Sequence, residues 1–145
     1  MDAVGLALGF TAGVLATLAM LPTELLAYRR WGLRGVFEWH EIHASLAGYQ
    51  SGRPFGAVGL AAHAILGGIV GAAFSIGRAI IPLPPFLIAF GIGVGLWVGT
   101  ILLHERVTAV HPWRNPMGPG PAATTLVSHL AYGVALGCVT GLLLP

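Results

Sequence analysis

Residues 122–144 have the sequence AATTLVSHLAYGVALGCVTGLLL, which contains no Asp, Glu, Lys or Arg in 23 positions. A helix needs about 20 mainly apolar residues to cross the hydrocarbon core of a bilayer. The whole chain has the same bias, because its 145 residues are 56% hydrophobic and only 8% charged. Soluble domains carry about 25% charged residues. We therefore predict a single domain, residues 1–145, embedded in the lipid bilayer.

Three further stretches are long and apolar enough to span, which gives four membrane helices. The predicted spans cover residues 3–26, 55–76, 85–103 and 122–144. Prolines separate the second span from the third and the third from the fourth, and proline disrupts helix interiors. Pro22 falls late in the first span and is predicted to kink it. The predicted fold class is an all-α, integral membrane four-helix bundle.

The arginines predict how the bundle is oriented. Six of the seven lie in the first and third loops, and only Arg78 lies in the second. The positive-inside rule assigns the first and third loops to the cytoplasm, so both termini are predicted to lie outside the plasma membrane. The arginines form no continuous basic stripe, so nucleic acid is not an expected partner.

The first loop contains a segment with amphipathic character over residues 35–50. Its apolar residues recur at helical spacing: Val36, Trp39, Ile42, Leu46 and Tyr49. This segment is too short to span, and aromatic residues suit the headgroup level of a bilayer. We predict an interfacial helix on the cytoplasmic surface.

Glycines recur every four residues in the predicted spans, which places them on one face of each helix. The glycines are Gly5, Gly9 and Gly13; Gly59, Gly67 and Gly71; Gly91, Gly95 and Gly99; and Gly133, Gly137 and Gly141. A face of small residues lets membrane helices approach closely. The pattern predicts tight helix packing through these faces.

The second and fourth spans share a spaced motif that suggests an internal repeat. Its members are Leu60, His63, Gly67 and Gly71, matched by Leu126, His129, Gly133 and Gly137. The first and third spans share the triple-glycine ladder. Together these matches predict a two-fold parallel repeat of helix pairs, about an axis along the membrane normal. A chance match in an apolar sequence is the alternative.

His63 and His129 are in register with the glycines of their helices, so both are predicted to face packed protein. Three interpretations remain open. The histidines hydrogen-bond across helices, or they are axial ligands of a haem or single ligands of pigments. In the third interpretation, residues at the cytoplasmic end bind zinc, iron or copper. The candidate metal ligands are His40, His43, His104, Glu24 and Glu41.

No catalytic residue is assigned from the sequence. Ser128 and His129 are neighbours on a helix and point about 100° apart, which does not make a nucleophile–base pair. No P-loop or HExxH motif occurs. The single cysteine, Cys138, lies in an apolar run and is predicted to be a small buried residue.

The motif SHLAYG at residues 128–133, with Gly137 beyond it, resembles the last helix of a group of small four-span membrane proteins of unknown function. These proteins have a histidine in the second helix, which His63 matches. The resemblance implies a compact four-helix bundle and no established activity.

Three functions are predicted from these features. The first is an accessory or structural subunit of a larger membrane complex, with a redox or energy-converting role and with other membrane subunits as partners. The second is a haem- or metal-binding membrane module that uses His63 and His129. The third is a small transporter with its path between the two halves. With so little chain outside the bilayer, an enzyme acting alone is not expected.

Overall fold

The computed structural model describes residues 3–31, 57–108 and 118–143, and within these ranges it contains helices and no strands. The helices are α1 (Ala3–Leu18), α2 (Leu21–Trp31), α4 (Ala57–Ile80), α5 (Pro85–Thr108) and α6 (Gly120–Leu143). The stretches apolar and long enough to cross a membrane are Ala3–Ala27, Gly59–Ile80, Pro85–Leu103 and Ala122–Leu143. The all-α membrane bundle is therefore confirmed. The predicted interfacial helix at residues 35–50 lies outside the described residues.

The helices do not all keep the predicted bounds, and α5 continues to Thr108, beyond the predicted end at residue 103. The second span was expected to end at residue 76, but α4 continues to Ile80. Arg78 falls in its last turn, where a positive charge interacts favourably with the helix C-terminus. The first span is divided into α1 and α2. The division falls just before Pro22, which was predicted to distort this span.

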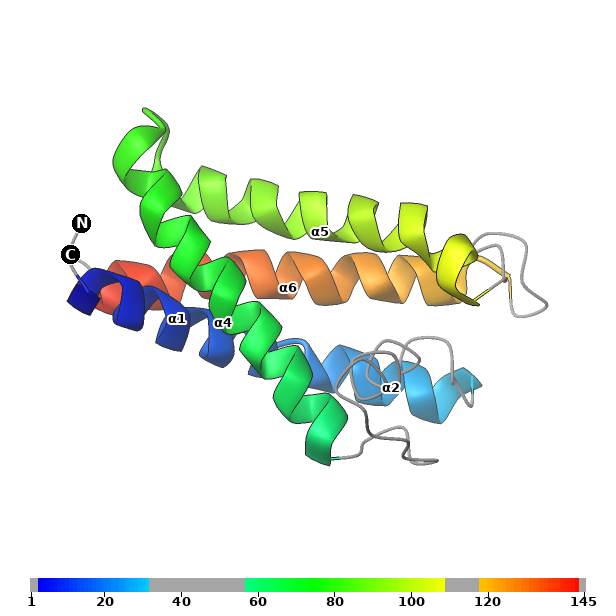
Figure 1. Cartoon of the computed structure of the whole chain (residues 1–145). Coiled ribbons are helices and arrows are strands. Elements are labelled where there is room, and N and C mark those ends of the chain that lie inside the picture. The colour runs from blue at the N-terminus through cyan, green and yellow to red at the C-terminus, as the bar shows by residue number, and fades with distance from the viewer. Residues whose placement is uncertain (1–2, 32–56, 109–117, 144–145) are drawn as a thin grey trace.

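The helices pack as two pairs (Figure 1). α4 crosses α1, while α5 lies along α6, and α1 and α2 together run beside α6. The beginning of α1, the end of α6 and the 81–84 connection lie at one end of the bundle. The other end, here called the loop end, is formed by the ends of α2 and α5 and the beginnings of α4 and α6. α1 and α5 thus run in the same direction, as a parallel repeat requires.

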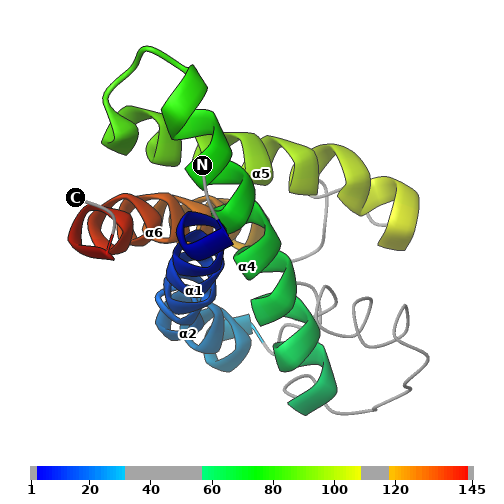
Figure 2. The same cartoon turned by 60° about the vertical axis from the view of Figure 1, so that its left-hand side comes forward.

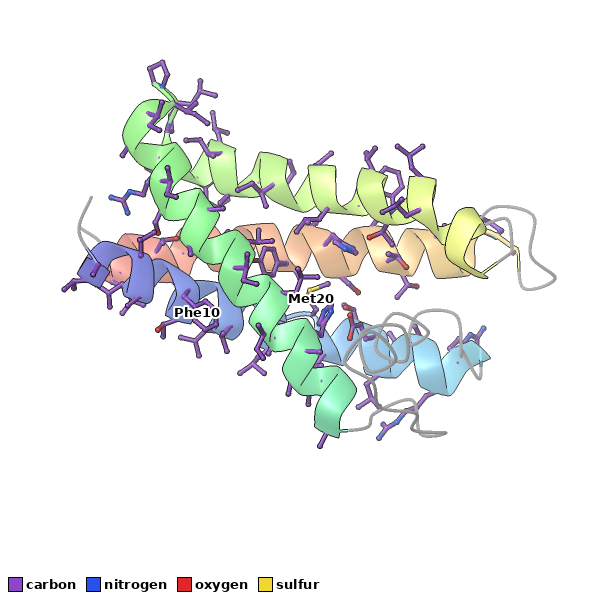
Figure 3. The ribbon with its side chains drawn as sticks, viewed as in Figure 1. Phe10 and Met20 are labelled. Atoms are coloured by element: carbon purple, nitrogen blue, oxygen red, sulfur yellow. The ribbon has the colours of Figure 1, made fainter. Side chains whose placement is uncertain are left out.

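Glycines allow α1 and α4 to touch backbone to backbone. A methyl group at Gly13 would overlap the carbonyl oxygen of Gly67, and one at Gly71 would overlap that of Gly9. Beside this crossing, the ring of Phe10 on α1 covers Gly68 (Figure 3). A larger residue at Gly13 or Gly71 would meet backbone atoms of the other helix and force the two helices apart.

The second pair, α5 and α6, meets through a different glycine from the one that the sequence suggested. Gly93 packs against Gly133 and the carbonyl oxygen of His129. A methyl group at Gly91, Gly95 or Gly99 would have no neighbouring atom within 4 Å. The predicted packing face of the third span is therefore wrong, because a helix that is apolar on all sides carries no signal that separates its protein face from its lipid face.

The glycine contacts seen in the structure lie at matching positions in the two helix pairs, α1 with α4 and α5 with α6. Gly67 meets Gly13 in the first pair, and Gly133 meets Gly93 in the second. Gly67 and Gly133 are equivalent positions of the motif shared by the second and fourth spans. This correspondence favours the predicted two-fold repeat, with Gly93 as the equivalent of Gly13 in place of Gly99, the third glycine of the shared ladder.

Large apolar side chains cover the outside of the bundle. Leu142 is 83% exposed, Ile80 74% and Leu102 68%, as expected where lipid replaces water around the protein. Cys138 is also exposed, so its predicted burial is wrong. It lies on the outer face of α6, about one turn beyond the exposed Val134.

Candidate functional site

A cavity of about 270 Å³ lies among the four spans, in the half of the bundle nearer the loop end. Its wall is mostly apolar, with contributions from α1, α2, α4, α5 and α6. The polar residues that line it are Thr17, Glu24, His63, Thr100, Thr125, Ser128, His129 and Tyr132. Protein interiors are otherwise close-packed, so this space and its polar lining mark the candidate site.

The break in the first span positions the acidic residue of the site. Pro22 has no backbone N–H, and its ring does not fit a helix interior. The amide of Met20 bonds to the carbonyl of Thr17, three residues back, at 3.1 Å, and the helix restarts at Leu21. Pro22 then falls in the first turn of α2, where proline is tolerated. Glu24 follows in the same turn and is only 4% exposed.

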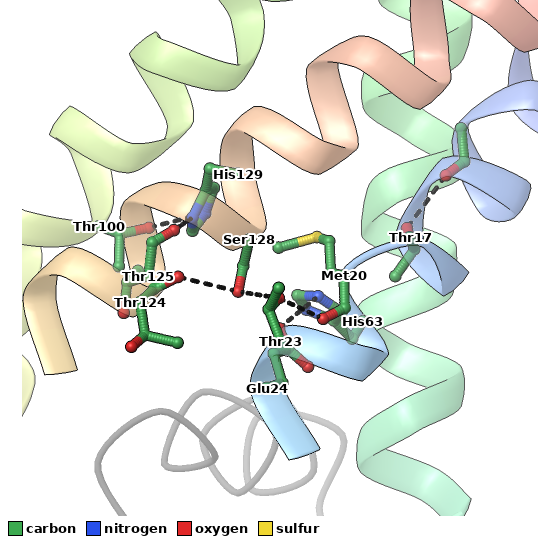
Figure 4. A network of polar contacts seen from close by, with 11 residues as sticks. Thr17, Met20, Thr23, Glu24, His63, Thr100, Thr124, Thr125, Ser128 and His129 are labelled. Carbon is green, nitrogen blue, oxygen red and sulfur yellow. Dashed lines mark hydrogen bonds and ion pairs between the residues drawn. The ribbon is translucent and has the colours of Figure 1, made fainter. Parts of the chain in front are cut away.

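Glu24 lies next to His63 of α4, and both residues line the cavity (Figure 4). His63 Nε2 is 4.0 Å from Glu24 Oε1, and the two side chains are 15% and 5% exposed. An isolated charge in a bilayer is costly, whereas a carboxyl and an imidazole that share one proton stay neutral as a pair. The pair therefore places a buried proton-carrying group beside the cavity.

A second polar contact joins α2 to α6. The hydroxyl oxygens of Thr23 and Ser128 are 2.6 Å apart. Thr23 also lies within hydrogen-bond distance of the Met20 carbonyl, at 2.7 Å, and Ser128 of the Thr124 carbonyl, at 3.1 Å. Each hydroxyl has one proton to donate, so two protons serve three contacts (Figure 4).

His129 is held by both ring nitrogens. Nδ1 lies 2.8 Å from the carbonyl oxygen of Thr125, which can only accept, so Nδ1 carries a proton. Nε2 lies 3.3 Å from the hydroxyl of Thr100 on α5. In the neutral ring Nε2 is an acceptor, so Thr100 donates to it. The bond to Thr100 links α6 to α5. The two bonds together fix the neutral ring in the tautomer with the proton on Nδ1.

Tyr132 is the largest buried side chain of the site. It is 2% exposed, and its hydroxyl donates to the carbonyl oxygen of Gly67 on α4 at 2.8 Å. The acceptor, Gly67, lies where α4 crosses α1. Met20, 4% exposed, fills the space at the break between α1 and α2 (Figure 3).

The structure brings some of the predicted site residues together. His63 and His129 both line the cavity, so the prediction that they face the interior is confirmed. Glu24 joins them. Sequence reasoning gave no role to Tyr132 and Thr100, although Tyr132 lies one helical turn from His129, which is the signal that could have found it.

The remaining candidate metal ligands are not assembled by the part of the chain that the structure describes. His40, Glu41 and His43 lie outside the described residues, and His104 belongs to α5 but its side chain is not described. Among the described residues, no group of three or more His, Cys, Asp or Glu side chains could hold a metal ion. The metal site remains a prediction.

The half of the bundle away from the loop end contains hydroxyls that serve their own helices. Thr11, Ser75 and Thr140 each donate to the carbonyl oxygen four residues earlier. Such bonds satisfy the hydroxyl without linking helices. The interhelical bonds of Thr23, His129 and Tyr132, by contrast, lie around the cavity.

Comparison with known proteins gives no relative from which a role could be transferred. No protein-family model matches the chain, and no curated protein or solved structure is significantly similar to it. The resemblance to small four-span proteins stays a prediction. What the site can do must be argued from its own geometry.

Proposed function

We propose that this multi-pass membrane protein binds a small, largely apolar molecule with one polar group inside the bilayer. The observation that carries the proposal is the cavity of about 270 Å³, which brings Glu24, His63 and His129 together from three helices. Ligand pockets are typically apolar clefts with a few convergent polar groups. This cavity has that character.

The cost of burying the polar residues supports a binding role. Ionisable side chains within membrane spans are rare and mark functional sites. A bundle that served packing alone would gain from an apolar residue in place of Glu24. The glycine crossings show that this chain packs helices closely elsewhere, so the space beside Glu24 is not a general looseness of the fold.

Two matched variants test the proposal. Val70 lines the cavity, whereas its neighbour Ile69 does not and is 55% exposed on the outer face. We expect Val70→Phe to fill the cavity and Ile69→Phe to leave it open. Native mass spectrometry of protein purified in mild detergent, after incubation with a total membrane lipid extract, measures the bound molecule.

We expect a bound species in wild type and Ile69→Phe, and about tenfold less in Val70→Phe, a loss of ~1.4 kcal/mol in binding. Equal occupancy of all three proteins would contradict the proposal. So would the absence of any bound species in wild type after the incubation.

A cofactor is the second candidate for the same cavity, and the His129 geometry favours it. Metal-ligating histidines commonly donate their other ring N–H to a backbone carbonyl, as Nδ1 of His129 does to Thr125. An absorption spectrum and a metal analysis of the purified protein test haem, iron, copper and zinc. If the cavity holds haem, its absorption band is lost in both His63→Ala and His129→Ala. A colourless, metal-free protein would exclude this candidate.

The other predicted roles need separate tests. Co-purification with larger subunits tests the accessory role in a redox or energy-converting complex, and solute flux into liposomes from the isolated chain tests the transporter. For orientation, we propose that the loops rich in arginine face the cytoplasm and that both termini lie outside the plasma membrane. Arg34→Cys and Arg78→Cys, each on a Cys138→Ser background, test this. Labelling of position 34 from outside intact cells would overturn the orientation.

A further inference from the structure

The cavity has a mouth on the outer surface of the bundle, between α4 and α5. Three residues that line the cavity are also exposed on the outside: Leu66 of α4 at 44%, Leu103 of α5 at 48%, and Gly95 of α5. α4 and α5 meet at the 81–84 connection and diverge toward the loop end (Figure 2). The opening therefore lies in the gap between these two helices.

The mouth opens into lipid. Leu66 belongs to the membrane span Gly59–Ile80, and Gly95 belongs to Pro85–Leu103. Leu66 lies seven residues beyond the start of the first stretch at Gly59, and Gly95 lies near the middle of the second. A molecule in this opening is in contact with the hydrocarbon core rather than with water.

Glycine keeps the α5 side of the mouth open. Gly95 and Gly99 both line the cavity, and a methyl group at either would meet no atom within 4 Å. Gly93, on another face of the same helix, packs directly on Gly133. One face of α5 therefore uses glycine for contact, and the other leaves space that no described side chain fills.

The polarity along the cavity matches that of a lipid in one leaflet. Its polar group, Glu24 with His63, lies toward the loop end. Going along α5 from Leu103 to Gly95, or along α4 from His63 to Val70, the wall leads toward the centre of the span. A bound amphiphile would point its head to the loop end and its chain to the bilayer centre, as lipids of the adjacent leaflet do.

Charge and size restrict the class of ligand. Among the described residues that line the cavity there is no Arg, so within this part of the chain a phosphate or carboxylate head would meet no guanidinium and would face Glu24. The volume of about 270 Å³ lies just under the ~300–1,000 Å³ of typical ligand pockets. That space suits a compact head and the first part of one chain, with the rest of the chain in the mouth.

We infer that the ligand is a single-chain amphiphile with an uncharged hydrogen-bonding head, and that it enters sideways from the bilayer between α4 and α5. This inference rests on the proposed binding function. The head lies at Glu24 and His63, and the chain crosses Gly99 and Gly95. Gly95 and Gly99 keep the entry open and do not contact the head.

The test uses the full chain in phosphatidylcholine nanodiscs with a monoacylglycerol that carries a photoreactive diazirine in its chain. Light converts the diazirine to a carbene, which inserts into nearby C–H bonds with loss of dinitrogen. Gly95→Leu places a side chain in the mouth, whereas Gly91→Leu adds the same side chain to the same helix outside the cavity. Gly99→Leu is a second blocking variant, and helix content confirms that each protein is folded.

We expect labelled peptides from α4 and α5 in wild type and Gly91→Leu, and about tenfold less labelling in Gly95→Leu and Gly99→Leu. Equal labelling of Gly95→Leu and Gly91→Leu, with labelling still lost in Val70→Phe, would overturn the lateral entry but keep the binding function. Labelling retained in Val70→Phe would overturn the binding function itself. Equal labelling by a two-chain diazirine phosphatidylcholine would overturn the assigned ligand class.

Discussion

The hydroxyl of Tyr132 donates to the carbonyl oxygen of Gly67 at 2.8 Å, and Gly67 is the residue on which α1 crosses α4. The Tyr132 side chain of α6 therefore binds to the place where α1 and α4 cross. The cavity lies directly beside this junction. Packing and the candidate site thus share a residue.

Tyr132→Phe removes this bond while it keeps the ring. We expect a loss of about 0.5–1.5 kcal/mol in the free energy of unfolding, measured by denaturation in mixed micelles. Thr11→Val is the control, because the Thr11 hydroxyl bonds only within its own helix, and we expect it to change stability less. A Tyr132→Phe protein as stable as wild type would show that the bond does not hold the junction.

Gly67→Ala and Gly133→Ala test the two equivalent crossings. Each added methyl group would overlap an atom of the facing helix, Thr17 or Ala89, so we expect each to destabilise the bundle by about 1–3 kcal/mol. Gly91→Ala adds the same group where nothing lies within 4 Å, and we expect no loss, because alanine favours helix over glycine. If all three variants were equally stable, the crossings would not be close-packed.

Glu24→Gln and His63→Gln, alone and combined, measure whether the two side chains act as a pair. We expect a coupling free energy of about 0.5–3 kcal/mol in a double-mutant cycle on unfolding, because each single change leaves the other partner buried without its counterpart. Additive effects would show that the 4.0 Å approach carries no interaction.

Cys138 is a native reporter of the lipid-facing surface. It is exposed on the bundle and lies inside the span Ala122–Leu143, so lipid should cover it. We expect a membrane-impermeant maleimide to leave it unlabelled in intact membranes and to label it after denaturation. Rapid labelling in sealed membranes from either side would contradict this placement of α6.

The spans could be predicted from sequence because length and hydropathy alone specify them. The inward position of His63 and His129 followed from their register with glycines, since Gly67, Gly71, Gly133 and Gly137 are packed against neighbouring helices. Gly141, at the end of the same series, meets no atom within 4 Å. The packing face of α5 could not be predicted, because Gly91, Gly93, Gly95 and Gly99 all lie in an apolar run and only the three-dimensional structure distinguishes them.

The approach of Glu24 to His63 also needed the structure. Pro22 indicated a distortion, but the direction in which α2 leaves the break depends on its packing against α6. The hydrogen-bond partners of His129 are the Thr100 hydroxyl on α5 and the Thr125 carbonyl of its own helix. Neither type of partner has a motif in the sequence, because hydroxyls and carbonyls occur throughout the spans.

The shared hydroxyl contact between Thr23 and Ser128 has a consequence for motion. Two protons make two hydrogen bonds while α2 touches α6. If the helices part, the proton that one hydroxyl donates to the other turns to a backbone carbonyl, so that Thr23 donates to Met20 and Ser128 donates to Thr124. Two hydrogen bonds are therefore made whether α2 and α6 touch at this point or separate. The contact beside Ser128, which lines the cavity, can open by exchanging one hydrogen bond for another, with none lost.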